Sequence, residues 1–391
     1  MRAMTRAPFA AASLAVLALA TAAPAQDPAV YQQEPKQSFK FAGDTLARYE
    51  WTRGIPVTSA GEPIAFIDQD RYRVQARPRI ELRFGPFELG VGGEFNYSED
   101  ENDVPPEGQS LTIIRDNYRS RDARLDLAYG KLTFGPVAVQ AGRFLMPLPL
   151  TEMIWDRDLR PQGGAATITL GDAQSPARLA LHGIYSLGSH VFDDEGDYLG
   201  ADALESGATE MYGGAAELAL GRAGESQLHV MGAYLQFEEL GKLEPPIRRQ
   251  NTRLAGLIVG KYHVFDIVGR LTRGGQVPLQ LVFDYCWNTE IDENNKGLWL
   301  AAVMGATGVS RGQLEYTYAK VDKDATLAAY NTDDFFWGTG WEGHRIDLGL
   351  TTKQKNSVHG IAQWQRFKDS ADPAERDLWV TRYRLEWRTR F

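Results

Sequence analysis

The chain has 391 residues, a formal charge of -9, 43% hydrophobic and 24% charged residues. This composition excludes a membrane protein made of several apolar helices, and it does not match the collagen, coiled-coil or disordered classes. A single cysteine, Cys286, cannot form a disulfide within the chain, so a disulfide scaffold is excluded as well.

The first 25 residues have the order of a secretory signal peptide. Arg2 and Arg6 precede an apolar stretch over residues 8–20, and Ala23 and Ala25 supply the small residues of a cleavage site. A first transmembrane helix is disfavoured, because the apolar stretch is shorter than the ~20 residues that a bilayer requires. We therefore predict a signal peptide at residues 1–25 and a short periplasmic segment at residues 26–37 of a bacterial envelope protein.

Beyond residue 37, apolar and polar residues alternate with a period of two, which is typical of β-strands. In residues 71–84, apolar positions such as Tyr72, Ile80 and Phe84 alternate with polar ones. In residues 379–391, Trp379 and Trp387 lie on one face of the expected strand. The opposite faces of these two segments carry Arg71, Arg73, Arg77, Arg79, Arg83, Arg382, Arg384, Arg388 and Arg390.

The predicted strands are joined by short turns and long polar links in alternation. Short turns are expected at residues 84–87, 134–137, 172–176, 221–226, 307–312 and 352–357, and long links at 54–65, 98–121, 145–164, 188–208, 322–342 and 368–376. This alternation is typical of outer-membrane β-barrels. Unpaired backbone groups cost several kcal/mol in hydrocarbon, so membrane-spanning strands must close on themselves. We predict an all-β, antiparallel, up-and-down transmembrane β-barrel of sixteen strands over residues 38–391. Fourteen or eighteen stay open, because residues 238–273 are ambiguous.

Several segments resemble a bacterial outer-membrane porin family of the sixteen-stranded type. They are Gly142-Arg143-Phe144, then Trp155-Asp156-Arg157-Asp158-Leu159, then Asp284-Tyr285-Cys286-Trp287-Asn288, and residues 324–334 followed by Gly343-His344. The resemblance implies a diffusion channel in the outer membrane that contacts lipid and lipopolysaccharide and has no cofactor. It also implies recognition of the terminal Phe391 by the barrel-assembly machinery. Many members of that family carry a coiled-coil-like stretch before the barrel, whereas this chain has only residues 26–37 at that place. A homotrimer formed through such a stalk is therefore not expected. A homotrimer formed by other contacts is left open.

A wide barrel requires an element that narrows it, and residues 145–164 are expected to fold inward for this purpose. The candidate constriction residues are Glu152, Asp156, Arg157, Asp158 and Arg160. An ordinary extracellular loop is the alternative. The facing wall is expected to consist of Arg48 and the nine arginines named above, which we call the predicted arginine wall. These residues become neighbours only if the first strand pairs with the last.

Opposite charges on the two sides would create a transverse field across the channel. The arginines also suit a structural ladder that is neutralised by Glu50, Glu81, Glu386 and Asp126, and both roles stay open. We predict a porin for passive diffusion of small hydrophilic solutes and ions, with a preference for anions at the constriction. The alternative is a substrate-specific channel or exporter for an anionic solute or saccharide.

Other functions have less support in the sequence. The six histidines lack the spacing of metal ligands, no nucleophile elbow is present, and the net negative charge disfavours nucleic-acid binding, so we predict no enzyme and no metal site. The acidic residues 193–197 and 292–295 suit solvated loops better than Ca²⁺ sites. The aromatic residues of 322–342, namely Tyr330, Phe335, Phe336, Trp337 and Trp341, are expected to pack over the mouth rather than to bind a sugar.

Overall fold

The computed structural model describes residues 37–391, with gaps at 60–61, 103–121, 173–174, 188–208, 223, 241–250, 255–256, 259, 307–310, 333, 336–337, 353–355 and 369–377. The predicted signal peptide, the predicted periplasmic segment up to residue 36 and the acidic residues 193–197 therefore lie outside the described residues. In the part of the chain that is described, no helix is long and apolar enough to cross a membrane.

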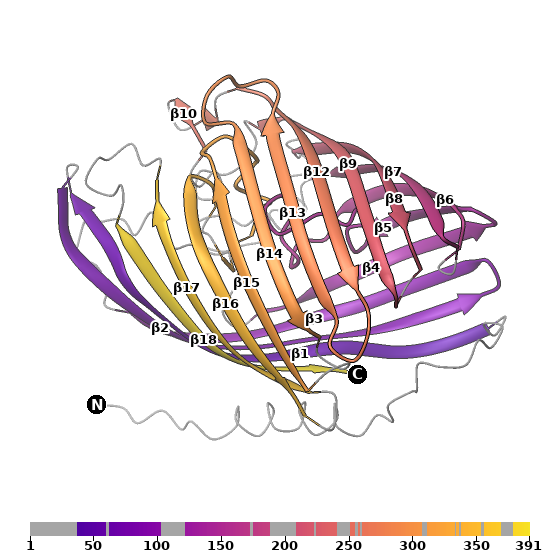
Figure 1. Cartoon of the computed structure of the whole chain (residues 1–391), viewed down its shortest axis with the longest axis horizontal. Helices are drawn as coiled ribbons and strands as arrows, with labels where there is room; N and C mark the ends of the chain where they lie inside the picture. The colour runs from indigo at the N-terminus through magenta and orange to yellow at the C-terminus, as the bar shows by residue number, and fades with distance from the viewer. Residues whose placement is uncertain are drawn as a thin grey trace.

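Sixteen antiparallel strands close into one barrel (Figure 1). They are β1 (Gln37–Ser59), β2 (Glu62–Phe84), β3 (Phe87–Asn102), β4 (Asp122–Phe134), β5 (Val137–Arg143), β6 (Gln162–Leu170), β7 (Ala177–Leu187), β8 (Glu210–Leu220), β9 (Ser226–Glu238), β12 (Tyr262–Arg273), β13 (Leu279–Asn288), β14 (Lys296–Gly305), β15 (Gly312–Val321), β16 (Trp341–Thr351), β17 (Ser357–Phe367) and β18 (Trp379–Arg390). A ribbon of β10 (Arg253–Leu254) and β11 (Leu257–Ile258) forms a separate small sheet. The predicted count of sixteen is confirmed.

The barrel closes where β1 pairs with β18. Each barrel strand pairs with its neighbours along the chain, and β1 pairs with both β2 and β18. Arg48 lies opposite Arg73 of β2 on one side and opposite Glu386 of β18 on the other. The first, second and last strands are therefore neighbours, as the sequence predicted.

Two-residue turns join β2 to β3 and β4 to β5 at the same end of the barrel. Phe84 pairs with Phe87 and Phe134 pairs with Val137, which leaves Gly-Pro as the turn in each case. Gly85 and Gly135 have φ values of 59° and 51°, a conformation that strongly favours glycine. Because the strand number is even, the carboxyl terminus lies at this same end.

The predicted long link at residues 54–65 is wrong. β1 continues to Ser59 and β2 begins at Glu62, so most of this stretch is strand. Gly54 has a φ of 77°, and the pairing register shifts between Thr52 and Ile55. The glycine therefore sits in a β-bulge, which absorbs one irregular residue without ending the strand.

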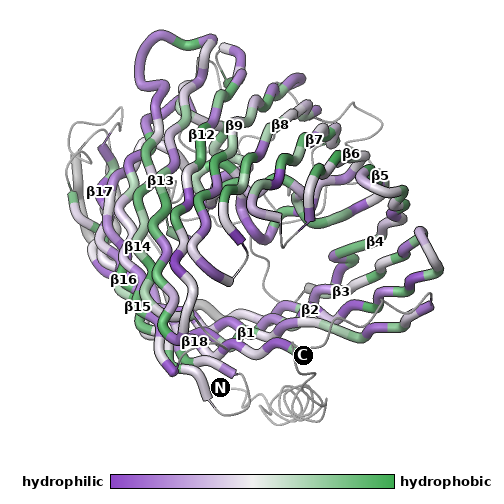
Figure 2. Tube along the Cα trace, turned by 45° about the vertical axis from the view of Figure 1, so that its right-hand side comes forward, coloured by the Kyte–Doolittle hydropathy of each residue, from purple (hydrophilic) through white to green (hydrophobic). Residues whose placement is uncertain are grey.

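The outer surface of the barrel is apolar. Along many of the strands, hydrophobic and hydrophilic residues alternate (Figure 2). Exposed hydrophobic side chains occur on strands all around the barrel, including Tyr72, Ile80, Val91, Leu125, Leu181, Leu218, Val230, Phe283, Leu300, Leu348 and Leu385. Residues of the opposite parity point inward, among them the buried Arg71, Arg73, Arg382 and Arg384. Such an outer face suits a surrounding of hydrocarbon.

On one side of the barrel the inner face is apolar as well. Met231 and Leu235 of β9, with Tyr262 and Val264 of β12, are 0% exposed and belong to a core inside the barrel. Because both faces of β12 are largely apolar, the period of two is weak in its sequence, which accounts for the ambiguity of the described residues 262–273. The interior therefore has an apolar side and a charged side.

Candidate functional site

The connection between β5 and β6, residues 144–161, folds into the barrel and is called the first inward loop. Its Met153 and Ile154 are 0% exposed. Arg270 of β12 donates a hydrogen bond to the Pro149 carbonyl oxygen at 2.6 Å, and the Thr151 hydroxyl donates one to Asp284 of β13. The loop thus crosses the interior from β5 and β6 to the opposite wall.

A glycine in the wall makes room for this loop. A Cβ atom added to Gly297 of β14 would lie 2.7 Å from Met153 Sδ and 2.6 Å from Cys286 Sγ. Both distances are well inside van der Waals contact, so any larger residue there conflicts with the packed methionine. The loop position and this wall glycine are therefore matched.

The connection between β15 and β16, residues 322–340, also folds inward and is called the second inward loop. The Tyr330 ring stacks on the Trp155 ring of the first loop and on Phe237 of β9, each at 5.4 Å between centroids. The Thr332 N–H donates to the Glu152 carbonyl oxygen at 2.9 Å. The two inward loops therefore pack together as one unit inside the barrel.

The described aromatic side chains of the segment 322–342 pack in the core. Tyr330, Phe335 and Trp341 are 2%, 0% and 1% exposed. Phe336 and Trp337 lie outside the described residues. The three described rings are buried in the core and leave no face free for stacking on a sugar.

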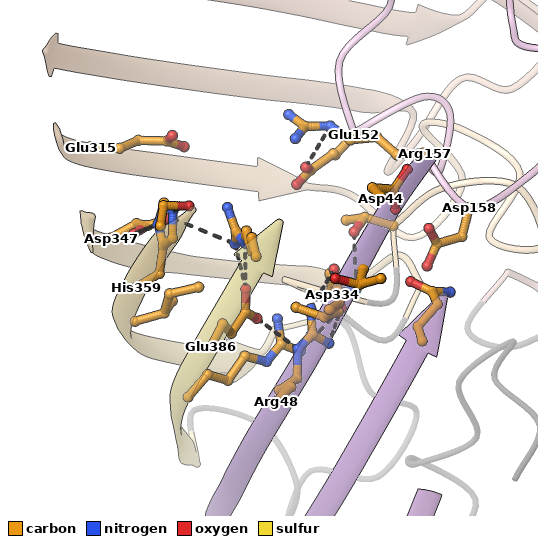
Figure 3. Close-up of a pocket in the computed structure, with 18 of the residues that line it drawn as sticks. Asp44, Arg48, Glu152, Arg157, Asp158, Glu315, Asp334, Asp347, His359 and Glu386 are labelled. Atoms are coloured by element: carbon orange, nitrogen blue, oxygen red, sulfur yellow. Dashed lines mark hydrogen bonds and ion pairs between the residues drawn. The ribbon is translucent and has the colours of Figure 1, made fainter. Parts of the chain in front are cut away.

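Asp334 connects the second inward loop to the charged side of the barrel (Figure 3). Its carboxylate accepts hydrogen bonds from Arg48 at 2.8 and 3.2 Å and lies 3.4 Å from Arg384 Nη2. Burial would raise the pKa of Asp334, but the guanidinium groups of Arg48 and Arg384 outweigh burial and hold this pKa well below its usual range. Asp334 is therefore a carboxylate at any ordinary pH.

Asp158 makes the corresponding contact from the first inward loop. Its carboxylate lies 2.6 Å from Arg77 Nη1 and 3.3 Å from Arg73 Nη2. Burial would raise the pKa of Asp158, whereas Arg77 and Arg73 lower it below its usual range. Each inward loop therefore presents one carboxylate to arginines of β1, β2 or β18.

The remaining candidate constriction residues differ in position. Glu152 lies 2.9 Å from Arg345 of β16 and 3.0 Å from Arg157, whose side chain is 80% exposed. Burial acts to raise the pKa of Glu152, and the two arginines lower it. Arg160 is buried and pairs at 2.8 Å with Asp126 of β4, so it faces the barrel wall.

The acidic residues expected to neutralise the arginines are all paired with basic residues. Glu50 bonds to Arg384 and lies 3.7 Å from Arg382. Glu386 lies 2.6 Å from Arg48. Near the short turns, Glu81 lies 2.8 Å from Arg79, and Glu88, which was not among the expected residues, lies 2.9 Å from Arg83. Ion pairing of the kind that the ladder alternative requires is therefore present.

A cavity of about 360 Å³ lies between the inward loops and the charged side of the barrel. Its lining includes the predicted residues Arg48, Arg77, Arg384, Arg388, Arg390, Glu152, Asp156, Arg157 and Asp158. It does not include Arg71, Arg73 and Arg382, which are buried in the wall, nor Arg79, Arg83 and Arg160. In total, seven arginines and eight carboxylates line it. The cavity is therefore highly charged but close to neutral.

Several residues of this cavity were missed in the sequence. They are Asp334, Arg345, Glu315, Asp347 and His359. Three of those on strands had a detectable signal. The apolar residues at 314, 316, 318, 346, 348 and 350 are expected to point outward, so Glu315, Arg345 and Asp347, which have the opposite parity, must point inward. Asp334 had no such signal, because it lies in a loop.

One hydrogen-bonded chain in the cavity resembles a catalytic relay. His359 lies 2.7 Å from Asp347 Oδ1 through Nδ1 and 2.9 Å from Ser357 Oγ through Nε2. Acyl transfer also requires hydrogen-bond donors that point at an oxyanion. The backbone of β17, which carries Ser357 and His359, is paired with β16 and β18, so its N–H groups there serve the sheet. Within the described ranges, no group of three His, Cys, Asp or Glu residues could hold a metal ion.

Comparison with solved structures defines the class of fold. The chain matches OprB of Pseudomonas putida with a TM-score of 0.52 and 11% identity, over 90% of this chain and 94% of that one. It also matches the anion-selective porin of Comamonas acidovorans (TM-score 0.49, 12% identity, 91% and 100% coverage) and OmpF of Salmonella typhi (TM-score 0.47, 12% identity, 90% and 97% coverage). The chain has the fold of a sixteen-stranded porin.

The likeness extends no further than the fold. No protein-family model matches the chain, and no curated protein matches its sequence. At 11% identity, a shared fold does not transfer a solute or a partner.

Proposed function

We propose that the chain is a porin of the bacterial outer membrane, through which small hydrophilic solutes and ions diffuse passively. The observation that carries the proposal is the closed barrel with an apolar outside and a charged inside. A closed sheet leaves no unpaired edge in hydrocarbon, and a barrel of sixteen strands is wide enough to enclose an aqueous path. Its apolar surface would contact lipid and lipopolysaccharide.

The first inward loop would narrow the channel opposite the predicted arginine wall. Support comes from the contacts of Asp158 with Arg73 and Arg77, which bring loop and wall together. The second inward loop would contribute to the same narrowing. The cavity lining is nearly neutral, so it lends no support to a preference for anions.

The terminal Phe391 would be the feature that the barrel-assembly machinery recognises. Its backbone exchanges hydrogen bonds with Gly43 at 2.9 and 3.1 Å, and its ring lies 5.4 Å from that of Phe41. A Phe391→Ala variant should therefore accumulate outside the outer-membrane fraction of cells. Normal recovery in that fraction would contradict this role.

Single-channel recording in a planar bilayer tests the function. Addition of the purified protein should produce stepwise, ohmic currents in KCl, and heat-unfolded protein should produce none. Absence of steps from the folded barrel would overturn the proposal. Selective block by one saccharide or one anionic solute would instead favour the substrate-specific channel.

A further inference from the structure

Among the described residues, carboxylates of the inward loops contribute to the charge balance on one wall of the barrel. Five arginines of β1, β2 and β18 are buried and lie close together, namely Arg48, Arg71, Arg73, Arg382 and Arg384. The strand carboxylates among them are Glu50 and Glu386. The further negative charge comes from Asp158 and Asp334, which belong to the two inward loops.

Asp334 sits on this wall in the way that a small carboxylate would bind to it. Two nitrogen atoms of Arg48 donate to its two oxygen atoms, which is the bidentate geometry that arginine forms with carboxylates. The Asp334 side chain is 36% exposed, whereas those of Arg48 and Arg384 are 6% and 4% exposed. All three residues line the cavity, so a solute can approach this contact from within it.

The backbone of Asp334 is held independently of its carboxylate. Gln363 of β17 donates to the Asp334 carbonyl oxygen at 2.9 Å, and Arg382 Nη1 lies 3.3 Å from the same atom. The side chain can therefore rotate away from Arg48 while the loop stays anchored.

We propose that Asp334 occupies a carboxylate-binding site formed by Arg48 and Arg384, and that a carboxylate group of a solute takes its place there. The inference rests on the proposed channel function and names the solute class as small carboxylates. Exchange replaces one arginine–carboxylate pair by another, so no guanidinium group is left without a counter-ion. The adjacent cavity of about 360 Å³ is within the range of small-molecule sites.

An internal competitor weakens the apparent affinity for a solute. The apparent Kd equals the intrinsic Kd divided by the fraction of time for which the competitor leaves the site vacant. Asp334→Asn removes the competing charge at nearly constant shape. Asp322→Asn is the matched control, because Asp322 belongs to the same loop but lies 3.8 and 3.9 Å from Lys320 and Lys368 instead. The probe is succinate, with uncharged succinamide as its neutral counterpart.

The readout is the succinate concentration that produces half of the maximal effect of succinate on the single-channel current. We expect succinate to act and succinamide to be inert, with the half-effect concentration about tenfold lower in Asp334→Asn and unchanged in Asp322→Asn. Equal half-effect concentrations in Asp334→Asn and the native protein would overturn the inference. Equal action of succinamide would overturn it as well.

Two further measurements separate the inference from the function. If the native barrel carries no current, the channel function fails. Titration calorimetry then measures the Kd of succinate for the detergent-solubilised protein and for both variants, and the same tenfold difference in Asp334→Asn tests the binding site. If Asp334→Asn does not fold, Arg48→Lys keeps the charge but loses the bidentate contact. It should raise the half-effect concentration, and an unchanged value would contradict the proposal.

Discussion

Glu50 of β1 and Arg384 of β18 face each other directly across the seam of the barrel, where Arg384 donates a hydrogen bond to the Glu50 carboxylate. Arg382 lies 3.7 Å from the same carboxyl group, and the Glu50 side chain is 4% exposed. The closure of the first strand onto the last therefore includes a buried ionic contact in addition to the backbone ladder.

Replacement of Glu50 by Gln should destabilise the barrel strongly. The change leaves Arg382 and Arg384 buried with one counter-charge fewer, and removal of one partner from a buried pair costs about 3–5 kcal/mol. Urea unfolding in detergent micelles measures the free energy of unfolding. Glu81→Gln is the control, because the partners of Glu81, Lys40 and Arg79, are 61% and 29% exposed, and the change should cost less than about 1 kcal/mol. Similar losses in both variants would argue against a special role of the seam.

The inward loops should stay docked when the pH falls from 7 to about 4. The pKa values of Asp334, Asp158 and Glu152 lie below their usual range because of the adjacent arginines. A lowered folded-state pKa means that the stabilisation is complete above the unfolded pKa of about 4 and is lost as the pH falls through the folded value. Single-channel conductance should therefore rise only below about pH 4.

The double variant Asp158→Asn/Asp334→Asn provides the comparison for this pH dependence. It should already have at pH 7 the higher conductance that the native barrel reaches only in acid. The two proteins differ only at Asp158 and Asp334, so the difference between their pH profiles reports the loop carboxylates. A native conductance that rises between pH 6 and 5, with no such rise in the double variant, would refute this assignment.

Gly297→Val should displace the first inward loop. The new side chain would occupy the position of the Met153 sulfur, which lies 2.7 Å from an added Cβ atom. Overpacking of this kind costs about 1–3 kcal/mol. We expect a lower free energy of unfolding and a larger single-channel conductance.

Gly360→Val is the matched control for this change. Gly360 also lies in a strand, β17, but an added Cβ atom would meet nothing within 4 Å. Its conductance should equal that of the native barrel. An increase of the same size in both variants would show that strand glycines in general, and not the Met153 contact, determine the effect.

Phe283→Arg should impair insertion into bilayers. Phe283 is 46% exposed on the outer face near the middle of β13, where an arginine costs about 2–4 kcal/mol in a membrane. Gln280→Arg, on the opposite face of the same strand, places the charge inside the barrel and should be tolerated. The yield of folded protein in lipid vesicles measures both. Equal yields would mean that the outer face does not contact hydrocarbon.

Much of the barrel could be predicted because its signal is local. In residues 71–84 and 379–391, side chains alternate between apolar and charged, and the period of two assigns each residue to a face without knowledge of its partners. The short Gly-Pro turns after Phe84 and Phe134 are equally local. The strand count was harder at β12, where the inward Tyr262, Val264 and Val268 and the outward Phe265, Ile267 and Leu271 are all apolar, because much of the inner face packs in the core of the barrel.

The contacts of the site were decided by the tertiary structure. Asp334 lies 286 positions from Arg48 in the chain, and they meet because the second inward loop crosses the closed barrel. A loop has no fixed period, so its sequence does not state which wall its carboxylate will reach. The sequence determined which strand faces are charged, whereas closure of the barrel and docking of both loops decided which arginine receives which carboxylate.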